Sequence, residues 1–570
     1  MSTMPARIPA SAFTSPRRRK HSLKGFNSVP PLKTRTFNPD DTFIPRATPN
    51  LSISYLREAL NSLDSKMSLL VAQRRELESQ LEQAVRLQSP VLRLPSELLS
   101  SIFVIGVLGM GDENPVMVPT LMLVCKYWEE VALNTPMLWA KISVSPHDSF
   151  EKAQRRLERS KSCPLDVTVN FGPRMEFTGS VTEQVVHAMD LFRPALWRTK
   201  SFHLSVPNRP QAHAALLRCQ EDAPLLENLT IQVYHSMQDD HYSSPPLPLF
   251  NGNTPRLRSC SLTSFNFGWD VRLVSNLRVL KLGGYFNAFT PSANTLISIL
   301  KLCPELEELA LRNMSSVDAE SCISMSDDFV SPTVSTKSIH LPRLKKASFY
   351  YVGIALTRQI MSQITFPNLE SLEMCYLENV TPVLQLLYIQ ALTKLPLRYL
   401  RIESCLFNEM KFVNLLRRIP SLVTLELVDV EDVSSNFLKG LSSSQPWVCP
   451  RLDTLTLDGC TSLDWDSLRS FVESRLPANP HAYARYHVLP SAITSSASAA
   501  AAAHVRSKSH PPRTQQVQPH TSSVCPHRLR AIDVTRCNQI SKEMVQWLRM
   551  YVAEVKCEAA KGIWGEPAML

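Results

Sequence analysis

The chain has 570 residues, of which 44% are hydrophobic and 20% charged, and its formal net charge is +10. This length is too great for one hydrophobic core, and the composition is ordinary for a globular protein, so we expect at least two folded units. No apolar run is long enough to cross a bilayer as a helix, and the first residues lack the apolar centre of a signal peptide.

Residues 1–50 are rich in Pro, Ser, Thr and Arg and have no hydrophobic periodicity, which predicts a disordered tail. Nine basic and two acidic side chains give this tail +7 of the total charge of +10. The rest of the chain is therefore nearly neutral, which argues against nucleic-acid binding by a folded surface. The basic cluster of Arg17, Arg18, Arg19 and Lys20 has two interpretations, an import signal or a solvated basic arm.

An apolar seam with alternating steps of three and four residues predicts a helix over residues 51–88. The seam consists of Leu56, Leu60, Leu63, Met67, Leu70, Leu77, Leu81 and Ala84, and Arg74 interrupts it. At ~1.5 Å per residue this helix is roughly 50 Å long. Two arrangements stay open: a dimeric coiled coil through the seam, or a single amphipathic helix that folds back onto the next module. In both, the helix is an interaction element.

Residues 89–144 contain three short segments with apolar residues at helical spacing. The first, LRLPSELLSSIFVIGVL, has Pro95 where the first turn of a helix tolerates proline. The second is LMLVCKYWEEVALN, and the third is TPMLWAKISV. Three short helices cannot bury this much apolar surface among themselves, so we expect a partner.

This stretch resembles an F-box. The matching blocks are, in order, Leu94-Pro95, Glu97-Leu98-Leu99, Ile102-Phe103, LVCKYW and Leu138-Trp139. In the F-box family, a trihelical module docks on the Skp adaptor of a cullin–RING ubiquitin ligase, and the resemblance implies the same partner here. The residues that would build or face this interface are Leu94, Pro95, Leu98, Leu99, Ile102, Phe103, Val124, Cys125, Trp128, Leu138 and Trp139.

One departure from the family is the segment from Gly109 to Met117, which makes the first connection between helices longer than usual. Loop closure becomes only slowly more costly with length, so we interpret the segment as a tolerated loop. Its effect on adaptor affinity stays open. The other interpretation of residues 89–144 is an ordinary helical hairpin inside a larger core.

An internal repeat follows in residues 145–570, after a helical stretch and a strand with alternating Leu165, Val167 and Val169. Its pattern is P-x-L-x-x-L-x-L, with first leucines at 226, 257, 277, 306, 344, 369, 397, 422 and 452; the copies at 226, 277 and 397, and a further copy near 529, are weaker. Gaps of 20 to 38 residues between consecutive members of the main series are typical of a leucine-rich repeat with irregular outer segments. Proline ends each outer helix and starts a strand whose alternate residues enter a shared core. Separate α/β units in a flat sheet are the alternative, but they do not explain why proline occupies the same position of the repeat in most copies.

The expected fold is therefore α/β: a short N-terminal coiled-coil helix, a trihelical F-box-like module and an irregular leucine-rich-repeat solenoid. A low-complexity segment at about 477–523 predicts an exposed insertion, and SKEMVQWLRMYVAEV predicts a closing helix. This order of modules resembles fungal F-box proteins with C-terminal leucine-rich repeats. Cys405, Cys460 and Cys537 stand where that family usually has Asn or Cys.

The sequence contains no HExxH, GxSxG, Walker, dinucleotide-binding or kinase motif. Cys-Pro recurs at Cys163, Cys303, Cys449 and Cys525, at strand entries that favour a packing role for the thiol. The 13 cysteines show no paired spacing, which favours reduced thiols and a cytoplasmic or nuclear location. We expect no catalytic residue, cofactor or metal site, and no enzyme activity.

The resemblance implies a substrate-recognition adaptor of a Skp–cullin–F-box ubiquitin ligase. The F-box would dock the Skp adaptor, the repeats would hold an unknown target protein, and proximity alone would promote transfer. A second hypothesis is a coiled-coil and leucine-rich-repeat scaffold unrelated to ubiquitin, which self-associates through residues 51–88. A third is nucleic-acid binding through the basic tail, which the charge distribution disfavours. We expect no membrane partner.

Overall fold

The computed structural model of the protein describes residues 53–88, 90–109, 116–172, 179–234, 246–286, 290–315, 339–391, 395–443, 447–476 and 526–557. The chain divides into two compact units, Met1–Arg93 and Leu94–Leu570. The expected basic tail with its Arg17 to Lys20 cluster, most of the connection from Gly109 to Met117, Cys525 and the insertion at 477–523 lie outside the described residues.

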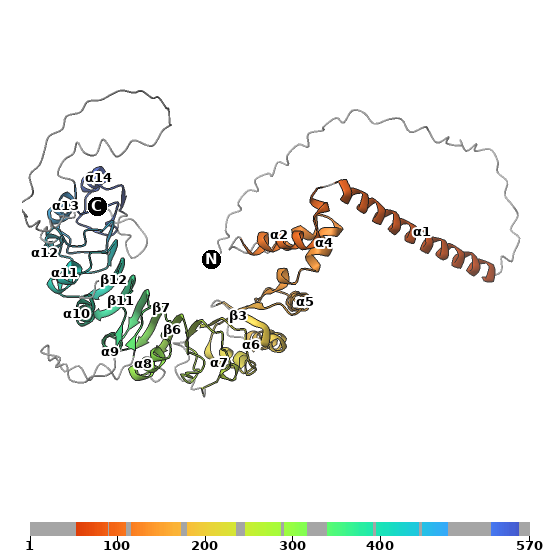
Figure 1. Ribbon diagram of the computed structural model, residues 1–570, viewed down its shortest axis with the longest axis horizontal. Coiled ribbons are helices and arrows are strands. Elements are labelled where there is room, and N and C mark those ends of the chain that lie inside the picture. The colour runs from red at the N-terminus through yellow and green to blue at the C-terminus, as the bar shows by residue number, and fades with distance from the viewer. Residues whose placement is uncertain are drawn as a thin grey trace, which may run out of the picture. The chain divides into compact units, whose positions relative to one another are not determined.

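The long helix α1 (Ile53–Gln88) confirms the helix expected over residues 51–88, and a 3-10 turn, η1 (Val91–Arg93), follows it (Figure 1). Its 36 residues correspond to a length of about 54 Å. Within the described part of this unit, no other element covers the apolar seam, and the seam residues from Leu56 to Leu81 are exposed. Arg74, the charged residue in the seam, pairs with Glu78 one turn later at 2.9 Å.

The second unit begins with four short helical segments: α2 (Ser96–Leu108), α3 (Met117–Met122), α4 (Lys126–Leu133) and the 3-10 helix η2 (Pro136–Trp139). Their buried core consists of Leu99, Phe103, Val118, Leu121, Val131, Ala132, Leu138 and Trp139. This core is separate from the larger core of the sheet that follows.

Two expectations for this region are wrong in detail. The segment LMLVCKYWEEVALN is not one helix, because the backbone is extended at Cys125 (φ −163°, ψ 166°) and restarts as α4. The third expected helix is only the short η2, because the next residues form strand β1 (Lys141–Val144), where Ile142 and Val144 are the buried alternate residues. Residues 141–144 therefore pair with β2 as part of the sheet, although the sequence analysis placed them in the helical module.

β1 is the first of 14 strands that form one sheet in the described part of the chain. All neighbouring strands of this sheet are parallel, and they follow one another in the order of the sequence. β8 (Ile339–His340) and β10 (Ile364–Thr365) lie outside it and form a separate parallel pair. The first half of the sheet continues with β2 (Leu165–Asn170), β3 (Thr199–Val206), β4 (Asn228–Val233), β5 (Ser259–Thr263), β6 (Val279–Phe286) and β7 (Glu308–Ser315). The second half consists of β9 (Lys346–Val352), β11 (Ser371–Asn379), β12 (Tyr399–Leu406), β13 (Thr424–Val428), β14 (Thr454–Asp458), β15 (Ala531–Asp533) and β16 (Glu554–Lys556). The mixed α/β class with a large parallel sheet is thereby confirmed.

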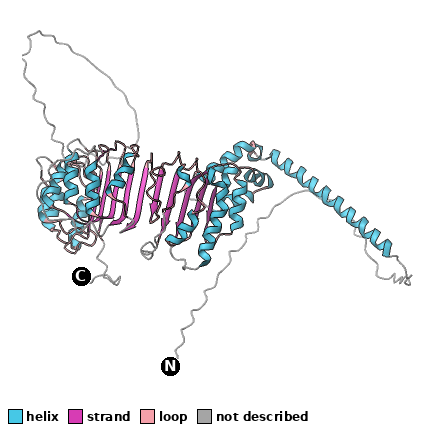
Figure 2. Cartoon of the chain, turned by 90° about the horizontal axis from the view of Figure 1, so that it is seen from below, coloured by secondary structure: helices cyan, strands magenta, loops and turns pink. Residues whose placement is uncertain are grey.

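Helices connect most neighbouring strands and line one side of the sheet, as α8 to α12 do in Figure 1, while Figure 2 shows the strands side by side. They are α5 (Phe150–Arg159), α6 (Gly179–Phe192), α7 (Arg209–Leu216), α8 (Ala293–Lys301), α9 (Ile354–Gln363), α10 (Thr381–Gln390), α11 (Glu409–Arg417), α12 (Ser435–Leu441), α13 (Trp465–Ser474) and α14 (Lys542–Tyr551), with the 3-10 turns η3 (Arg193–Arg198) and η5 (Phe250–Gly252). The expected closing helix is present as α14, but the sequence did not predict β16 after it.

Alternate residues of the strands form continuous buried rows. Leu400 lies opposite Leu425, which in turn lies opposite Leu455 on the next strand. The first leucine of every predicted copy is also buried: Leu226, Leu257, Leu277, Leu306, Leu344, Leu369, Leu397, Leu422, Leu452 and Leu529. The pairing of Leu455 with Ile532 continues this register between β14 and β15, although the predicted insertion lies between them in the sequence.

Candidate functional site

Helix α2 has apolar side chains on two faces. Pro95 precedes its first turn, and the Pro95 carbonyl accepts a hydrogen bond from the Leu99 N–H at 3.1 Å. Leu99 is buried, whereas Leu98, Ile102 and Ile105 are 55%, 52% and 70% exposed. Steps of four and then three residues place these three on one face of the helix. We call Leu98, Ile102 and Ile105 the α2 surface.

The structure divides the residues predicted for the adaptor interface according to burial. Four are buried (Leu99, Phe103, Leu138 and Trp139), three are partly buried (Leu94, Cys125 and Trp128) and four are exposed (Pro95, Leu98, Ile102 and Val124). The buried four shape the module and are not accessible to a partner. Sequence reasoning missed Ile105, although it continues the spacing of Leu98 and Ile102, and Leu123, which is 86% exposed.

Three contacts hold α2 and η2 against α4. The ring of Phe103 lies 5.0 Å from that of Trp128. The Tyr127 hydroxyl donates to the Leu94 carbonyl at 3.0 Å, and the Trp139 indole N–H donates to the Ala132 carbonyl at 2.9 Å. These contacts fix the start of α2, so the α2 surface is presented on a rigid support.

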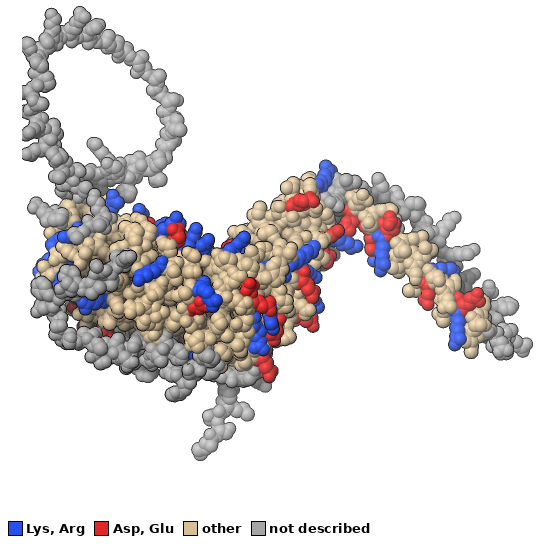
Figure 3. Space-filling view, turned by 60° about the horizontal axis from the view of Figure 1, so that its bottom comes forward, with Lys and Arg blue, Asp and Glu red and all other residues tan. Residues whose placement is uncertain are grey.

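A groove of about 620 Å³ lies where α3 and η2 meet α5. Its apolar lining includes Met122, Leu123 and Trp139. Basic side chains of α5 form one side of it, and the Arg159 guanidinium lies 4.5 Å from the centre of the Trp139 ring. Over the face that Figure 3 shows, by contrast, basic and acidic side chains are interspersed.

The strand residues that do not enter the core change in character along the sheet. One register row carries Ser143, Thr168, His203, Thr230 and Ser261 on β1 to β5. The same row continues through Lys281, Ala310 and Ser348 on β6, β7 and β9 to Glu373, Arg401, Glu426, Thr456 and Asp533 on β11 to β15. Charge on this row is therefore concentrated in the C-terminal half of the sheet.

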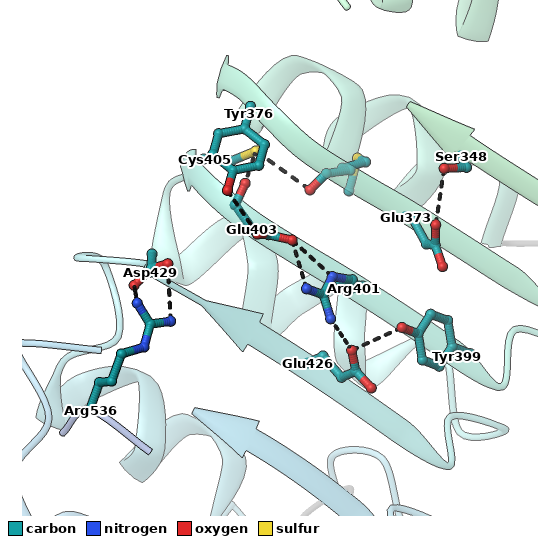
Figure 4. Close-up of polar contacts among 11 residues, drawn as sticks. Ser348, Glu373, Tyr376, Tyr399, Arg401, Glu403, Cys405, Glu426, Asp429 and Arg536 are labelled. Carbon is teal, nitrogen blue, oxygen red and sulfur yellow. Dashed lines mark hydrogen bonds and ion pairs between the residues drawn. The ribbon is translucent and has the colours of Figure 1, made fainter. Parts of the chain in front are cut away.

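Arg401 lies between two carboxylates on its own and the next strand (Figure 4). Its Nη2 is 2.7 Å from Glu403 Oε2, and its Nη1 is 2.6 Å from Glu426 Oε2. The hydroxyls of Tyr376 and Tyr399 donate to Glu403 and Glu426, each at 2.9 Å. We call Arg401, Glu403 and Glu426 the first triad.

Proton affinities follow from these contacts. Partial burial disfavours the charge of Glu403, but hydrogen bonds from Arg401 and Tyr376 outweigh it and lower the pKa of this carboxyl. The hydrogen bond to Glu403, with partial burial, raises the pKa of Tyr376 to about 12. For Arg401, burial opposes the charge, yet its bonds to Glu403 and Glu426 raise the guanidinium pKa. Arg401 and Glu403 are therefore both charged at neutral pH.

Arg536 makes a second triad with Asp429 and Asp458. Its Nη1 is 2.8 Å from Asp429 Oδ1, and its Nε is 2.7 Å from Asp458 Oδ1. The guanidinium reaches Asp429 across Gly459, where an added Cβ would lie 2.1 Å from Asp429 Oδ1. The glycine is required for this bridge. The bond to Asp458, partly offset by burial, raises the pKa of Arg536.

Gly459 belongs to a row of left-handed residues that lie in the C-terminal parts of nine neighbouring strands or shortly after them. Ser264, Gly284, Asn313, Tyr351, Tyr376, Ser404, Asp429, Gly459 and Arg536 all have φ between 47° and 70°. Strand register aligns them. From β5 to β14, the residue before each left-handed residue pairs with the residue before the next one, as Thr263 does with Gly283 and Val428 with Asp458. The pairing of β14 with β15 extends this alignment to Arg536. We call these nine residues the left-handed row. Non-glycine residues take this conformation at a cost, so the fold imposes it at each position.

Two neighbours in the left-handed row are tyrosines. The rings of Tyr351 and Tyr376 stack with centres 4.3 Å apart and an angle of 6° between their planes. Tyr350 contacts both rings edge-on, each with centres 5.2 Å apart. Tyr351 is 48% exposed. We call Tyr350, Tyr351 and Tyr376 the tyrosine cluster.

The cysteines predicted to follow strand leucines serve packing between strands. The thiols of Cys405, Cys460 and Cys537 contact the carbonyl oxygens of Met374, Leu427 and Leu457 at 3.6, 3.7 and 2.8 Å. Among the described Cys-Pro cysteines, Cys303 and Cys449 are buried and donate to the carbonyls of Val274 and Leu416, while Cys163 is only partly buried. Burial raises the pKa of Cys449 to about 12, so this thiol stays protonated at neutral pH.

No known protein family and no curated protein matches this chain. Among the described residues, no helix combines the length and the apolar character needed to cross a membrane. The same residues contain no group of three or more His, Cys, Asp or Glu side chains arranged to hold a metal ion.

Proposed function

We propose that the protein is the substrate-recognition subunit of a Skp–cullin–F-box ubiquitin ligase. Residues 94–139 act as the F-box, and the strand and helix units after them act as a leucine-rich-repeat solenoid. The first docks the Skp adaptor and the second holds a target protein. Transfer of ubiquitin to the target then follows from proximity, with no catalytic side chain from this chain.

The observation that carries this proposal is the α2 surface. A small module with its own core presents three apolar side chains to solvent on a rigid helix, directly after the Leu94-Pro95 pair. Large apolar side chains grouped on an exposed surface mark interaction sites in soluble proteins. Parallel strands stacked in chain order, with buried leucines in rows, support the repeat assignment.

The test is co-purification of the full chain with a Skp-type adaptor. We expect wild type to retain the adaptor and the double variant Leu98→Glu, Ile102→Glu to lose it, because both side chains are exposed and their replacement leaves the core intact. Ile389→Glu, an equally exposed isoleucine on α10, is the matched control and should bind like wild type. Absence of the adaptor from wild type, or its retention by the double variant, would contradict the proposal.

The scaffold hypothesis keeps one observation in its favour, the exposed seam of α1. It predicts that wild type is a dimer and that Leu63→Asp with Leu70→Asp makes it a monomer, which light scattering after size exclusion measures. A dimer that does not bind the Skp adaptor would favour the scaffold. A monomeric wild type would exclude self-association through α1 at the concentrations used.

A further inference from the structure

The tyrosine cluster is an aromatic surface outside the core of the sheet, in which Tyr351 is exposed and Tyr350 and Tyr376 are partly buried. Buried residues of the same strands that enter the opposite side include Ala347, Phe349, Leu372 and Met374. Tyr351 and Tyr376 instead occupy left-handed positions where Asn313 stands on β7. Tyrosine at such a position costs more backbone strain than asparagine, and aromatic side chains dominate binding energy at protein interfaces.

The strand face beside the tyrosine cluster, from β11 to β15, carries mainly acidic side chains. Each triad has two carboxylates around one arginine and therefore keeps one negative charge. Glu373 and Asp533 lie in the same register row as Arg401 and Glu426. Their carboxylates accept hydrogen bonds from the hydroxyls of Ser348 and Thr535. The two triads with Glu373 and Asp533 thus carry a net charge of −4. Two basic side chains lie beside them: Arg312, 6.0 Å from the centre of the Tyr350 ring, and Lys556, opposite Asp533 on β16.

We propose that the tyrosine cluster and the strand face from β11 to β15 bind an extended, arginine- or lysine-containing segment of another protein. This inference rests on the function proposed above and names the kind of target segment that the repeats hold. A guanidinium or ammonium gains from the faces of tyrosine rings, and further basic residues gain from the carboxylates of the triads. An acidic segment would meet like charge on the same surface.

The length of the segment follows from strand spacing. Four strand intervals of ~4.8 Å separate β11 from β15, which is about 19 Å in total. An extended chain rises ~3.3 Å per residue, so about six residues cross this face. Carboxylates of the row with Glu373, Glu426 and Asp533 recur on every second strand, about 10 Å apart, so basic residues three positions apart match them.

The experiment measures binding of two labelled peptides, (Arg-Gly-Ser)4 and (Glu-Gly-Ser)4, to the full chain by fluorescence anisotropy. We expect the arginine peptide to bind, the glutamate peptide not to bind, and the affinity to fall with added salt. The double variant Tyr351→Asn, Tyr376→Asn should bind the arginine peptide about tenfold more weakly. Asparagine suits the left-handed backbone, as Asn313 does in the same row, so this variant keeps the fold.

A second pair of variants tests the charge. Glu373→Gln with Asp533→Asn removes the two carboxylates outside the triads and should also weaken binding. Glu221→Gln with Glu227→Gln, on other surfaces of the unit, is the control with an equal change of charge and should bind like wild type. Equal binding of both peptides, or unchanged affinity in the tyrosine variant, would overturn the proposal.

Co-purification with the Skp adaptor separates this inference from the proposed function. The tyrosine and carboxylate variants lie outside the α2 surface and should retain the adaptor. A chain that binds the arginine peptide but not the adaptor keeps the binding surface and refutes the ligase role. A chain that binds the adaptor but not the peptide keeps the ligase role and refutes the inference.

Discussion

Gly459 shows how much one residue of the left-handed row determines. Its φ of +69° is unfavourable for any residue with a Cβ, and its missing side chain leaves the space through which Arg536 reaches Asp429. The backbone conformation and the ion pair thus both depend on the absence of a Cβ at residue 459.

We therefore expect Gly459→Ala to lower the free energy of unfolding by about 1–3 kcal/mol, from left-handed strain and a displaced, partly exposed ion pair. Urea denaturation measures this change. Gly353→Ala is the matched control, because Gly353 has a φ of −52° and its added Cβ meets no atom within 4 Å. Equal effects of the two substitutions would show that the space at Gly459 is not needed.

Glu403 makes stability depend on pH. Its pKa is lowered in the folded chain from the ordinary value of 4.5, so its stabilising bonds are fully present above about pH 4.5 and disappear as the pH falls through the folded value. We expect Glu403→Gln to cost about 1–2 kcal/mol at pH 7 and to reduce the loss of stability below pH 4.5. Urea denaturation at pH 7, 5 and 4 checks both. Parallel pH profiles for wild type and variant would exclude this role.

At the scale of elements, α2 is a helix with one face in a core and another in solvent. Leu98 and Leu99 are adjacent in sequence but lie on different faces, and only Leu99 is buried. We expect Leu99→Ala to lower the free energy of unfolding by about 2–5 kcal/mol, because it leaves a cavity. Leu98→Ala should change it by less than about 0.5 kcal/mol. Thermal unfolding of the two variants compares them, and a larger effect at Leu98 would reverse the assignment of the faces.

The elements of the sheet were largely predictable, because proline marks the start of most strands and leucine spacing marks their buried side. The break at Cys125 was not, since nothing in the local apolar pattern separates LMLVCKYW into a helix end and a helix start. Strand β1 was also missed as an element, because four residues with two buried positions give too short a pattern.

The candidate surfaces divide in the same way. Leu98 and Ile102 were predicted from helical spacing and family resemblance, and Ile105 needed only one more step of that spacing. The two triads were not predictable, because Arg401 and Glu426 are 25 residues apart and Arg536 and Asp429 are 107 residues apart. Such residues come together only through the pairing of their strands. The pairing of outward-facing residues cannot be predicted from the sequence, because these positions tolerate most polar side chains.

At the scale of the whole molecule, the second unit joins strands that are distant in sequence. Thr454, Leu455 and Thr456 pair with Ala531, Ile532 and Asp533 as regularly as any other neighbouring strands do. The register of the sheet therefore continues from β14 to β15, the two neighbouring strands that lie farthest apart in the sequence.

We expect replacement of residues 477–525 by about 12 Gly and Ser residues to change the free energy of unfolding by less than about 1 kcal/mol, because loop-closure entropy depends weakly on length. Urea denaturation measures it. Removal of residues 526–557, which contain β15, α14 and β16, is the comparison and should be strongly destabilising because it uncovers β14 and part of the core. A comparable loss in both variants would show that the intervening chain contributes to folding.

The left-handed row has a consequence for how this protein can change over evolution. Nine backbone sites share one conformation, yet they carry serine, glycine, asparagine, tyrosine, aspartate and arginine. Most of the stability is supplied by the leucine rows on the other side of the strands, so mutation can vary an exposed member such as Tyr351 with little risk to folding, whereas Gly459 and the buried Ser264 and Gly284 are constrained. A lineage that inherits this scaffold can therefore acquire new binding preferences one strand at a time, while its architecture stays under separate selection.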